Sequence, residues 1–222
     1  MKCSALLFDL DGTLVDSLLD LRSGLNQMLS EMGRRELSPE EVRLMIGDGS
    51  RALVGRALSA TGSPTDAEDA SYQRFMQIYQ AGLSHLTRLY PGVEETLRTL
   101  RDEGARLAIC TNKPQAATVA LLQQLGIAGY FDAILCGDVV PFRKPDPRHL
   151  LLALEQLRAV PKESAMIGDN ENDYAAARGA GLPVILMRYG YLRVPPETLT
   201  PQMWLDRFSD LPQALGSLTP RD

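Results

Sequence analysis

The chain has 222 residues, 45% of them hydrophobic, which suits one large domain or a domain with an insertion. Its formal net charge of −5 gives no basic footprint for nucleic acid, and its longest apolar runs fall short of the ~18 residues that a membrane span needs. Asp9 and Asp11 interrupt the first apolar run too early for a signal peptide. Three scattered cysteines argue against a disulfide framework and favour a reducing cytoplasm: Cys3, Cys110 and Cys136.

The first element is an apolar run over residues 5–8 that leads directly into two carboxylates. Such a run suits a strand buried on both faces, so Asp9 should stand at the carboxyl end of a parallel strand, where open α/β sheets bind ligands. Asp11 lies two positions further and can face the same side, while Gly12 lets the backbone turn away. Two close carboxylates push their pKa values apart unless a cation or proton lies between them. A strand end with an Asx turn is the simpler alternative, but it does not explain two acids.

Residues 16–86 show helical periodicity only. Helix starts are predicted at Ser50 and at two capping boxes, Ser38 with Glu41 and Thr65 with Glu68. The apolar stripes predict the core of a small helical bundle, without a cofactor box. Because the bundle lies between the first strand and the rest of the chain, we expect it to be an insertion folded over the carboxyl edge of the sheet.

After residue 90, helices and strands alternate. Strands are predicted at 106–110, 133–136, 164–168 and 183–187, and helices at 93–103, 115–125, 147–157 and 171–180. This alternation predicts an α/β fold with a doubly wound parallel sheet. The tail after Tyr191 is expected to pack on the outside through Trp204, Leu205 and Phe208. His85 and His149, in predicted helical contexts, have no partner at ligand spacing and are interpreted as surface or packing residues.

Thr111 and Lys144 follow two of the predicted strands. A hydroxyl and free N–H groups at a helix start bind phosphate, although Thr111 or Asn112 could equally be a plain helix cap. Pro145 holds Lys144 in an extended conformation, which fixes a cation at the mouth of a loop. A solvated lysine is the usual alternative. However, the chain has four lysines against nineteen arginines, and two of the four stand in strand-end loops, where a compact ammonium suits a phosphate oxygen.

Asp169 and Asp173 follow the strand predicted at 164–168, four residues apart at a helix start. The helix dipole favours acids at such a position, which is a sufficient structural explanation by itself. Together with Asp9 and Asp11, however, they form an acidic cluster of the oxygen ligands that Mg²⁺ prefers.

In order along the chain, these pieces resemble the four motifs of the haloacid-dehalogenase superfamily. The matching residues are Asp9-Leu10-Asp11-Gly12-Thr13, then Thr111, then Lys144, then Gly168-Asp169 with Asp173. The resemblance covers nearly the whole chain, including the inserted helical cap. More specifically, the sequence resembles the phosphoglycolate phosphatase subfamily over 8–17, 46–49, 53–58, 110–114 and 143–147. One departure is Asn170, where relatives often have Ser or Thr.

The resemblance implies a Rossmann-like core at 1–15 and 88–222 and a helical cap at 16–87. It implies Mg²⁺-dependent hydrolysis of a small phosphorylated metabolite through an aspartyl-phosphate on Asp9, with 2-phosphoglycolate as the favoured substrate. Asp11 would protonate the leaving alcohol and later deprotonate the attacking water, starting protonated because Asp9 beside it is ionised. The metal would be held by Asp9, the backbone carbonyl of Asp11, and Asp169.

The resemblance also implies roles for the remaining loop residues. Lys144, Thr111 and Asn112 would bind the phosphoryl group, while Thr13 and Asp173 would support the site from behind. The carboxylate of phosphoglycolate needs a donor once water is excluded. Arg51, beside the Gly47–Gly49 turn of the cap, and Lys113 on the core side are the expected cations.

Several alternatives stay open at this point. A haloalkanoate dehalogenase would lack an acid at the position of Asp11, and a phosphonatase would need a cap lysine, which is absent between Lys2 and Lys113. A mutase of the β-phosphoglucomutase kind, a sugar phosphatase or a pyrophosphatase fits the motifs equally well. A phospho-acceptor or binding module is the non-enzyme alternative. The assembly is expected to be a monomer or a homodimer.

Overall fold

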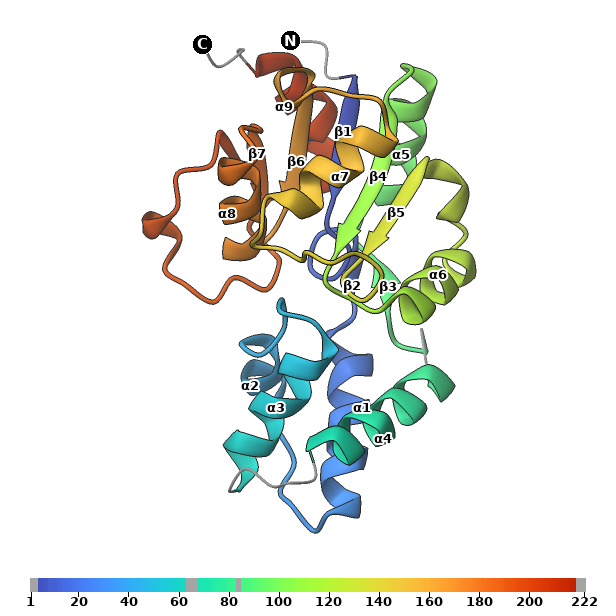
Figure 1. Cartoon of the computed structure of the whole chain (residues 1–222), viewed down its shortest axis with the longest axis vertical. Coiled ribbons are helices and arrows are strands. Elements are labelled where there is room, and N and C mark those ends of the chain that lie inside the picture. Colours follow the sequence, from blue (N-terminus) through green and yellow to red (C-terminus); the bar gives the residue numbers. More distant parts are fainter. Residues whose placement is uncertain (1–3, 63–67, 83–84, 219–222) are drawn as a thin grey trace.

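The computed structural model describes residues 4–62, 68–82 and 85–218. Its main sheet has six parallel strands in the spatial order β5-β4-β1-β6-β7-β8 (Figure 1). The strands are β1 (Ala5–Phe8), β4 (Arg106–Thr111), β5 (Ala133–Cys136), β6 (Ser164–Gly168), β7 (Val184–Met187) and β8 (Met203–Leu205). The doubly wound parallel sheet expected from the alternating pattern is therefore confirmed.

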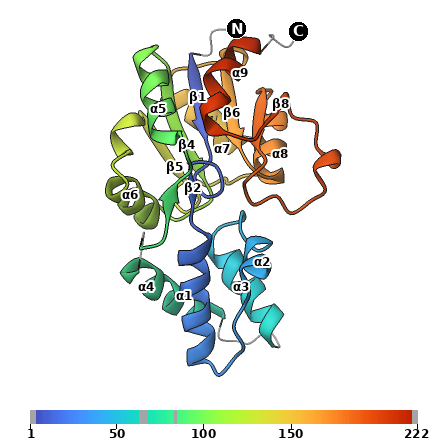
Figure 2. The same cartoon turned by 180° about the vertical axis from the view of Figure 1, so that it is seen from behind.

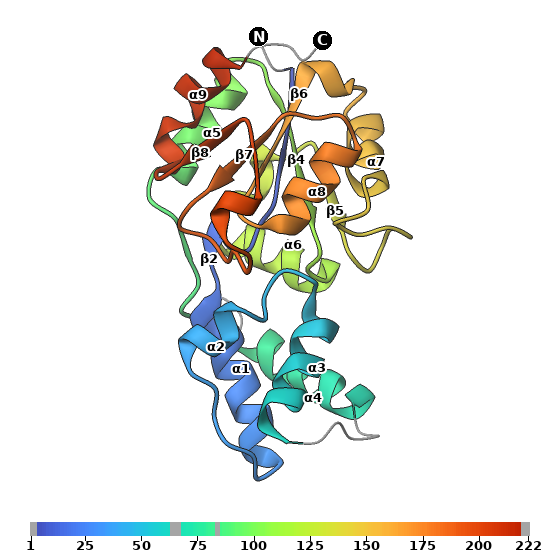
Figure 3. The same ribbon diagram turned by 90° about the vertical axis from the view of Figure 1, so that its left-hand side faces the viewer.

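Helices cover both faces of this sheet (Figure 3). One face carries α5 (Val93–Asp102), α6 (Gln115–Gln124) and α9 (Leu211–Ser217), and the other carries α7 (Arg148–Gln156) and α8 (Glu171–Gly179). Alternate residues of β1 face opposite sides, so Leu6 and Phe8 enter the first apolar cluster and Leu7 enters the second. Burial on both faces explains why β1 reads as an unbroken apolar run.

A two-stranded antiparallel ribbon, β2 (Val15–Asp16) with β3 (Arg88–Leu89), connects the sheet to the inserted helices. The insertion consists of α1 (Leu18–Glu31), α2 (Pro39–Arg43), α3 (Ser50–Thr61) and α4 (Glu68–Ala81), which we call the cap. Figures 1 and 2 show the cap beyond the carboxyl ends of the strands, at the opposite end of the molecule from both termini. Within the described ranges, no helix combines the length and the apolarity needed to cross a membrane.

Local signals in the cap correspond closely to the observed helix ends. Ser38 accepts a hydrogen bond from the Glu41 amide at 3.2 Å, and the Glu41 carboxylate accepts one from the Ser38 amide at 2.9 Å, so this capping box is confirmed. Ser50 opens α3 as predicted. The second predicted box involves Thr65, which lies outside the described residues.

Outside the main motifs, one feature was not predicted and two expectations were wrong. The β2–β3 ribbon was not predicted, because two-residue strands carry too little periodicity to be recognised. The tail does not simply pack on the outside: it supplies the edge strand β8 and the helix α9, and Phe208 is fully buried against Phe8. His85 lies in a bend after α4 rather than in a helix, whereas His149 is buried within α7.

Short 3₁₀ helices occupy Ala128–Tyr130, Pro161–Glu163, Pro196–Thr198 and Phe208–Asp210.

Candidate active site

Three neighbouring strands deliver the candidate site to one edge of the sheet. The strands β4, β1 and β6 are adjacent, and their carboxyl ends lead into Thr111, Asp9 and Asp169 respectively. Parallel strands place these ends side by side, although the residues are far apart in the sequence. The loop after β5 adds Lys144, preceding a cis peptide bond to Pro145. The sequence motifs therefore meet where the parallel sheet was expected to bring them together.

Lys144 lies between two buried carboxylates. Its Nζ is 2.6 Å from Asp9 and 2.7 Å from Asp173. Burial lowers the pKa of the Lys144 ammonium, but the charges of Asp173 and Asp9 outweigh burial and hold that pKa above its usual range. Lys144 therefore remains a cation, which is what a phosphoryl-binding ammonium requires.

Asp9, Asp169 and Asp173 form a buried acidic cluster in which one ligand oxygen of each lies within 4.8 Å of the others. Burial raises the pKa of Asp9 to about 6, opposed by Lys144 and reinforced by the charge of Asp173. Burial, followed by the charges of Asp173 and Asp9, raises the pKa of Asp169 well above its usual value. The cluster places three carboxylates beside one ammonium, Lys144, and such a set of oxygen ligands is suited to a divalent cation.

Backbone and hydroxyl donors fix the direction of the Asp169 carboxylate. Thr13 Oγ1 donates to it at 3.1 Å and the Tyr191 amide donates at 2.6 Å. Asp173 lies behind, where it accepts from the backbone amides of Asp169 and Asn170 at 3.0 and 3.2 Å. Asn170 caps α8, so its departure from the usual Ser or Thr leaves a capping side chain in place.

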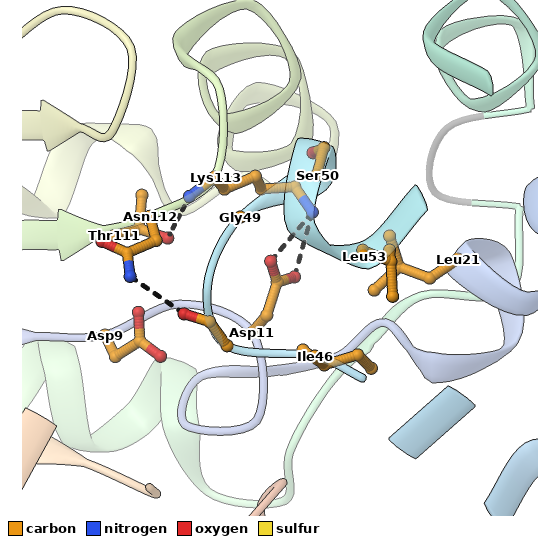
Figure 4. Close-up of a pocket in the computed structure, with 11 residues that line it drawn as sticks. Asp9, Asp11, Leu21, Ile46, Gly49, Ser50, Leu53, Thr111, Asn112 and Lys113 are labelled. Atoms are coloured by element: carbon orange, nitrogen blue, oxygen red, sulfur yellow. Dashed lines mark hydrogen bonds and ion pairs between the residues drawn. The ribbon is translucent and has the colours of Figure 1, made fainter. Parts of the chain in front are cut away.

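Asp11 faces a cation rather than the Asp9 carboxylate. Its two oxygens are 3.0 and 3.1 Å from Lys113 Nζ (Figure 4). Ser17 Oγ donates to one of them at 2.6 Å. The expectation that repulsion between Asp9 and Asp11 sets their proton states needs correction. The carboxylate whose charge raises the pKa of Asp9 is Asp173, and the charged group that contacts the Asp11 carboxylate is the Lys113 ammonium.

The loop after β4 carries the remaining core residues of the site. Thr111 Oγ1 accepts from the Lys113 amide at 3.1 Å, so the threonine side chain shapes the turn before α6. Asn112 Nδ2 donates to the backbone oxygens of Gly47 at 2.9 Å and of Lys144 at 2.8 Å. Asn112 thus links two core loops to the cap through hydrogen bonds, whereas the sequence predicted only a position beside the substrate.

A pocket lies between this core edge and the cap (Figure 4). It is lined by Asp9, Asp11, Leu21, Ile46, Gly47, Gly49, Ser50, Leu53, Thr111, Asn112 and Lys113. The core contributes the charged and polar side chains, whereas the cap contributes apolar side chains and the turn before α3. This combination can hold a small anionic molecule against Asp9 while excluding most water.

The cap turn at Gly47–Ser50 reaches the core, as expected from its two glycines. Gly49 has φ 89°, and a Cβ atom there would lie 2.8 Å from the backbone oxygen of Asn112. Asp48, the residue between the two glycines, does not pair with Arg51, which is paired with Asp69. Asp48 is instead paired with Arg56 and with Arg193, and it accepts from Asn172 Nδ2 at 2.7 Å.

Arg51 does not line the pocket, which corrects its predicted place at the substrate. Its guanidinium is paired with Asp69 and lies 4.5 Å from the centroid of the Tyr72 ring, and about half of its side chain is exposed. The physical reason is helical geometry. Ser50 faces the pocket, and the next residue of a helix points about 100° away from it. Lys113, by contrast, is buried and lines the pocket.

Sequence reasoning missed three residues that complete the site. Tyr79 accepts a hydrogen bond from Lys113 Nζ at 2.8 Å, Tyr191 holds Asp169, and Arg193 joins the cap to the core through Asp48. Tyr79 was interpreted as bundle core because its spacing is helical. Tyr191 lies just beyond the carboxyl end of β7, and this position after a strand is the one sequence signal that could have identified it as a site residue.

Comparison with known proteins agrees with this geometry. A sequence model described as haloacid dehalogenase-like hydrolase matches residues 6–187. A phosphoglycolate phosphatase of Agrobacterium fabrum is 42% identical over 211 residues, which cover 94% of this chain and 91% of the relative. The crystal structure of a predicted phosphoglycolate phosphatase from Haemophilus somnus superposes with a TM-score of 0.92 at 33% identity, covering 96% of this chain and 98% of that one. The crystal structure of CbbY from Rhodobacter sphaeroides in complex with phosphate superposes with a TM-score of 0.83 at 27% identity, covering 96% of this chain and 99% of that one.

Proposed function

This chain belongs to the haloacid dehalogenase-like hydrolase family and is a phosphatase, and we propose that it hydrolyses 2-phosphoglycolate to glycolate and phosphate. The observation that carries the proposal is the pocket between core and cap. Asp9 lies in it beside two lysines: Lys144 is paired with Asp9 itself, and Lys113 is on the wall. A substrate with a phosphoryl group and a second anion matches two buried cations at separate positions.

In the proposed mechanism, Asp9 is the nucleophile. A carboxylate oxygen of Asp9 attacks phosphorus to form an aspartyl-phosphate, while the bond from phosphorus to the glycolate oxygen breaks. In this proposal Asp11 must enter this step as the protonated acid; it gives that proton to the same oxygen, so that glycolate leaves as the alcohol. Asp11 then takes a proton from the water that attacks the aspartyl-phosphate, and inorganic phosphate departs with Asp9 restored.

The acidic cluster fits a Mg²⁺ ion. Three buried carboxylates lie close together beside one ammonium, and the pKa values of Asp9 and Asp169 are raised by burial first and by a neighbouring carboxylate charge second. Asp9, Asp169 and the backbone carbonyl of Asp11 would hold the ion, with Asp173 directing Lys144 from behind. When bound, Mg²⁺ withdraws charge from the phosphoryl oxygens.

Other residues of the chain bind and orient the substrate in this proposal. Lys144 and the Thr111 hydroxyl stabilise the phosphoryl group, and Asn112 keeps their two loops in register. Since Arg51 is turned away from the pocket, Lys113 supplies the positive charge on the pocket wall that attracts the carboxylate, while its N–H groups stay on Asp11 and Tyr79. The apolar side chains of the cap exclude water around these charges, which strengthens each interaction.

We further propose the division into a core of residues 1–15 and 88–222 and a cap of residues 16–87. The β2–β3 ribbon, which pairs Asp16 with Arg88, supports this division because it lies at both junctions. The proposal also places the protein in the cytoplasm, and the buried free thiols of Cys110 and Cys136 support a reducing compartment. The proposed assembly is a monomer or a homodimer.

A panel of substrates with Mg²⁺ tests the proposed function. The panel contains 2-phosphoglycolate, sugar phosphates, pyrophosphate, p-nitrophenyl phosphate and a chloroalkanoate. We expect the highest kcat/KM with phosphoglycolate. Phosphate release only from sugar phosphates or pyrophosphate, transfer of phosphate within a sugar, or chloride release would each replace the proposal with the corresponding alternative.

A pair of variants tests the carboxylate site. Lys113→Met keeps the length of the side chain but removes its charge, so we expect it to raise KM for phosphoglycolate about tenfold or more and to change KM for p-nitrophenyl phosphate far less. Arg51→Met is the matched control and should leave both KM values unchanged, because Arg51 lies outside the pocket. Equal changes for both substrates in Lys113→Met would remove Lys113 from carboxylate binding.

A further inference from the structure

The cap helix α4 reaches the active site through the side chain of Tyr79. The Tyr79 hydroxyl accepts a hydrogen bond from Lys113 Nζ at 2.8 Å, and the same ammonium lies 4.8 Å from the centroid of the Tyr79 ring. Lys113 Nζ in turn contacts both oxygens of Asp11 at 3.0 and 3.1 Å. A continuous chain of polar contacts therefore runs from the cap, through Lys113, to Asp11 of the core.

Tyr79 has a fixed place within the cap. Its ring is stacked on Phe75, with the centroids 5.6 Å apart and the planes at 8°. Helix α1 packs closely against both residues at Gly24, where a Cβ atom would lie 3.2 Å from the Phe75 ring and 3.7 Å from the Cβ of Tyr79. Only 2% of Tyr79 is exposed. The hydroxyl therefore moves with the cap as a rigid body rather than as a free side chain.

Lys113 needs this hydroxyl because its ammonium is buried. An ammonium has three N–H donors, and here two are directed at Asp11 and one at Tyr79. A buried ammonium that loses an acceptor must turn or draw in water, since an unsatisfied charged donor is costly. Asp11 would follow this movement, because Lys113 contacts both of its oxygens and Ser17 holds only one of them.

We propose that Tyr79 is a positioning residue that acts through Lys113 to aim Asp11 at the leaving oxygen of the substrate. Because Tyr79 belongs to the cap and Asp11 to the core, the proton donor is correctly placed only while the cap lies against the core. This inference rests on the proposed function in one respect, the assignment of Asp11 as the proton donor. It adds a cap residue to the groups that determine the proton-transfer step.

The substitution Tyr79→Phe tests the proposal, because it removes the hydroxyl and keeps the stacked ring. We expect kcat to fall about tenfold for 2-phosphoglycolate, whose alkoxide needs a proton, and by less than about twofold for p-nitrophenyl phosphate, whose leaving group does not. The matched control is Tyr72→Phe on the same helix, whose ring faces Arg51 and not the pocket, and it should change neither rate. Equal losses on both esters would overturn the proposal.

A double-mutant cycle shows whether Tyr79 acts through Lys113. We expect Tyr79→Phe to have no further effect on kcat once Lys113→Met is present, whereas additive effects would overturn the proposal. The same double-mutant cycle can also be measured as coupling between the two substitutions in thermal unfolding, a readout that does not depend on any substrate. If the wild type prefers another alkyl phosphate, that ester replaces phosphoglycolate in the comparison. If no ester is hydrolysed, the proposed function fails, and absence of coupling in the unfolding cycle would refute the Tyr79–Lys113 contact separately.

Discussion

Replacement of Gly49 by alanine tests whether the cap turn must touch the core for catalysis. Gly49 has φ 89° and ψ 169°, a conformation used almost only by glycine. A Cβ atom there would lie 2.8 Å from the backbone oxygen of Asn112, which is part of the loop that carries Thr111 and Lys113. The contact is with backbone, so it cannot be relieved by rotation of a side chain.

Two separate magnitudes follow from this geometry. The backbone conformation costs about 1–3 kcal/mol for alanine, which lowers Tm by roughly 2–4 °C for each kcal/mol in a chain of this size. The clash is relieved only if the turn moves by about 0.6 Å, from 2.8 Å to the 3.4 Å at which such contacts become ordinary. A displacement of this order in a catalytic loop costs about tenfold or more in kcat/KM.

The assay is steady-state hydrolysis of phosphoglycolate combined with thermal unfolding, and Gly104→Ala is the control. Gly104 also has a positive φ, 85°, but a Cβ atom there would meet no heavy atom within 4 Å. We therefore expect Gly104→Ala to lower Tm and leave kcat/KM unchanged, while Gly49→Ala lowers both. Wild-type kcat/KM in Gly49→Ala would refute the argument that this contact positions the active-site loop.

Further predictions concern the acidic residues of the core. Asp9→Asn should abolish turnover while the protein stays folded. Without Mg²⁺ the wild type should lose stability relative to this variant as pH rises from 3.8 to about 6, because the raised pKa of Asp9 makes ionisation unfavourable in the folded state. Substantial activity of Asp9→Asn, or a wild type that gains stability over this pH range, would contradict the assignment. Asp11→Asn should slow phosphoglycolate hydrolysis by roughly 10²–10⁴, with a smaller loss for p-nitrophenyl phosphate, and equal losses would exclude Asp11 as the acid. Chelation should stop activity and Asp169→Ala should raise the Mg²⁺ concentration needed for half-maximal rate, whereas full activity in excess chelator would contradict the metal site.

The elements that the sequence predicted well are those whose signals are local. The apolar run before Asp9 is buried on both faces, and the Ser38–Glu41 box caps α2 through bonds within four residues. The core motif residues Asp9, Thr111 and Asp169 were located correctly at strand ends, since a parallel sheet gathers such ends at one edge. The sequence alone therefore determined the fold class and the edge of the sheet where the chemistry lies.

Tertiary structure alone decided which charged groups face each other. Lys113 pairs with Asp11 across 102 residues, and Asp48 pairs with Arg193 across 145, so neither partnership leaves a trace in local spacing. Arg51 points away because Ser50, its neighbour on α3, faces the pocket, and only the packing of the cap on the core shows which face of α3 does so. Strand β8 is likewise only three residues long and is held by pairing with β7. Such contacts depend on the distances between elements after folding, which local sequence patterns do not encode.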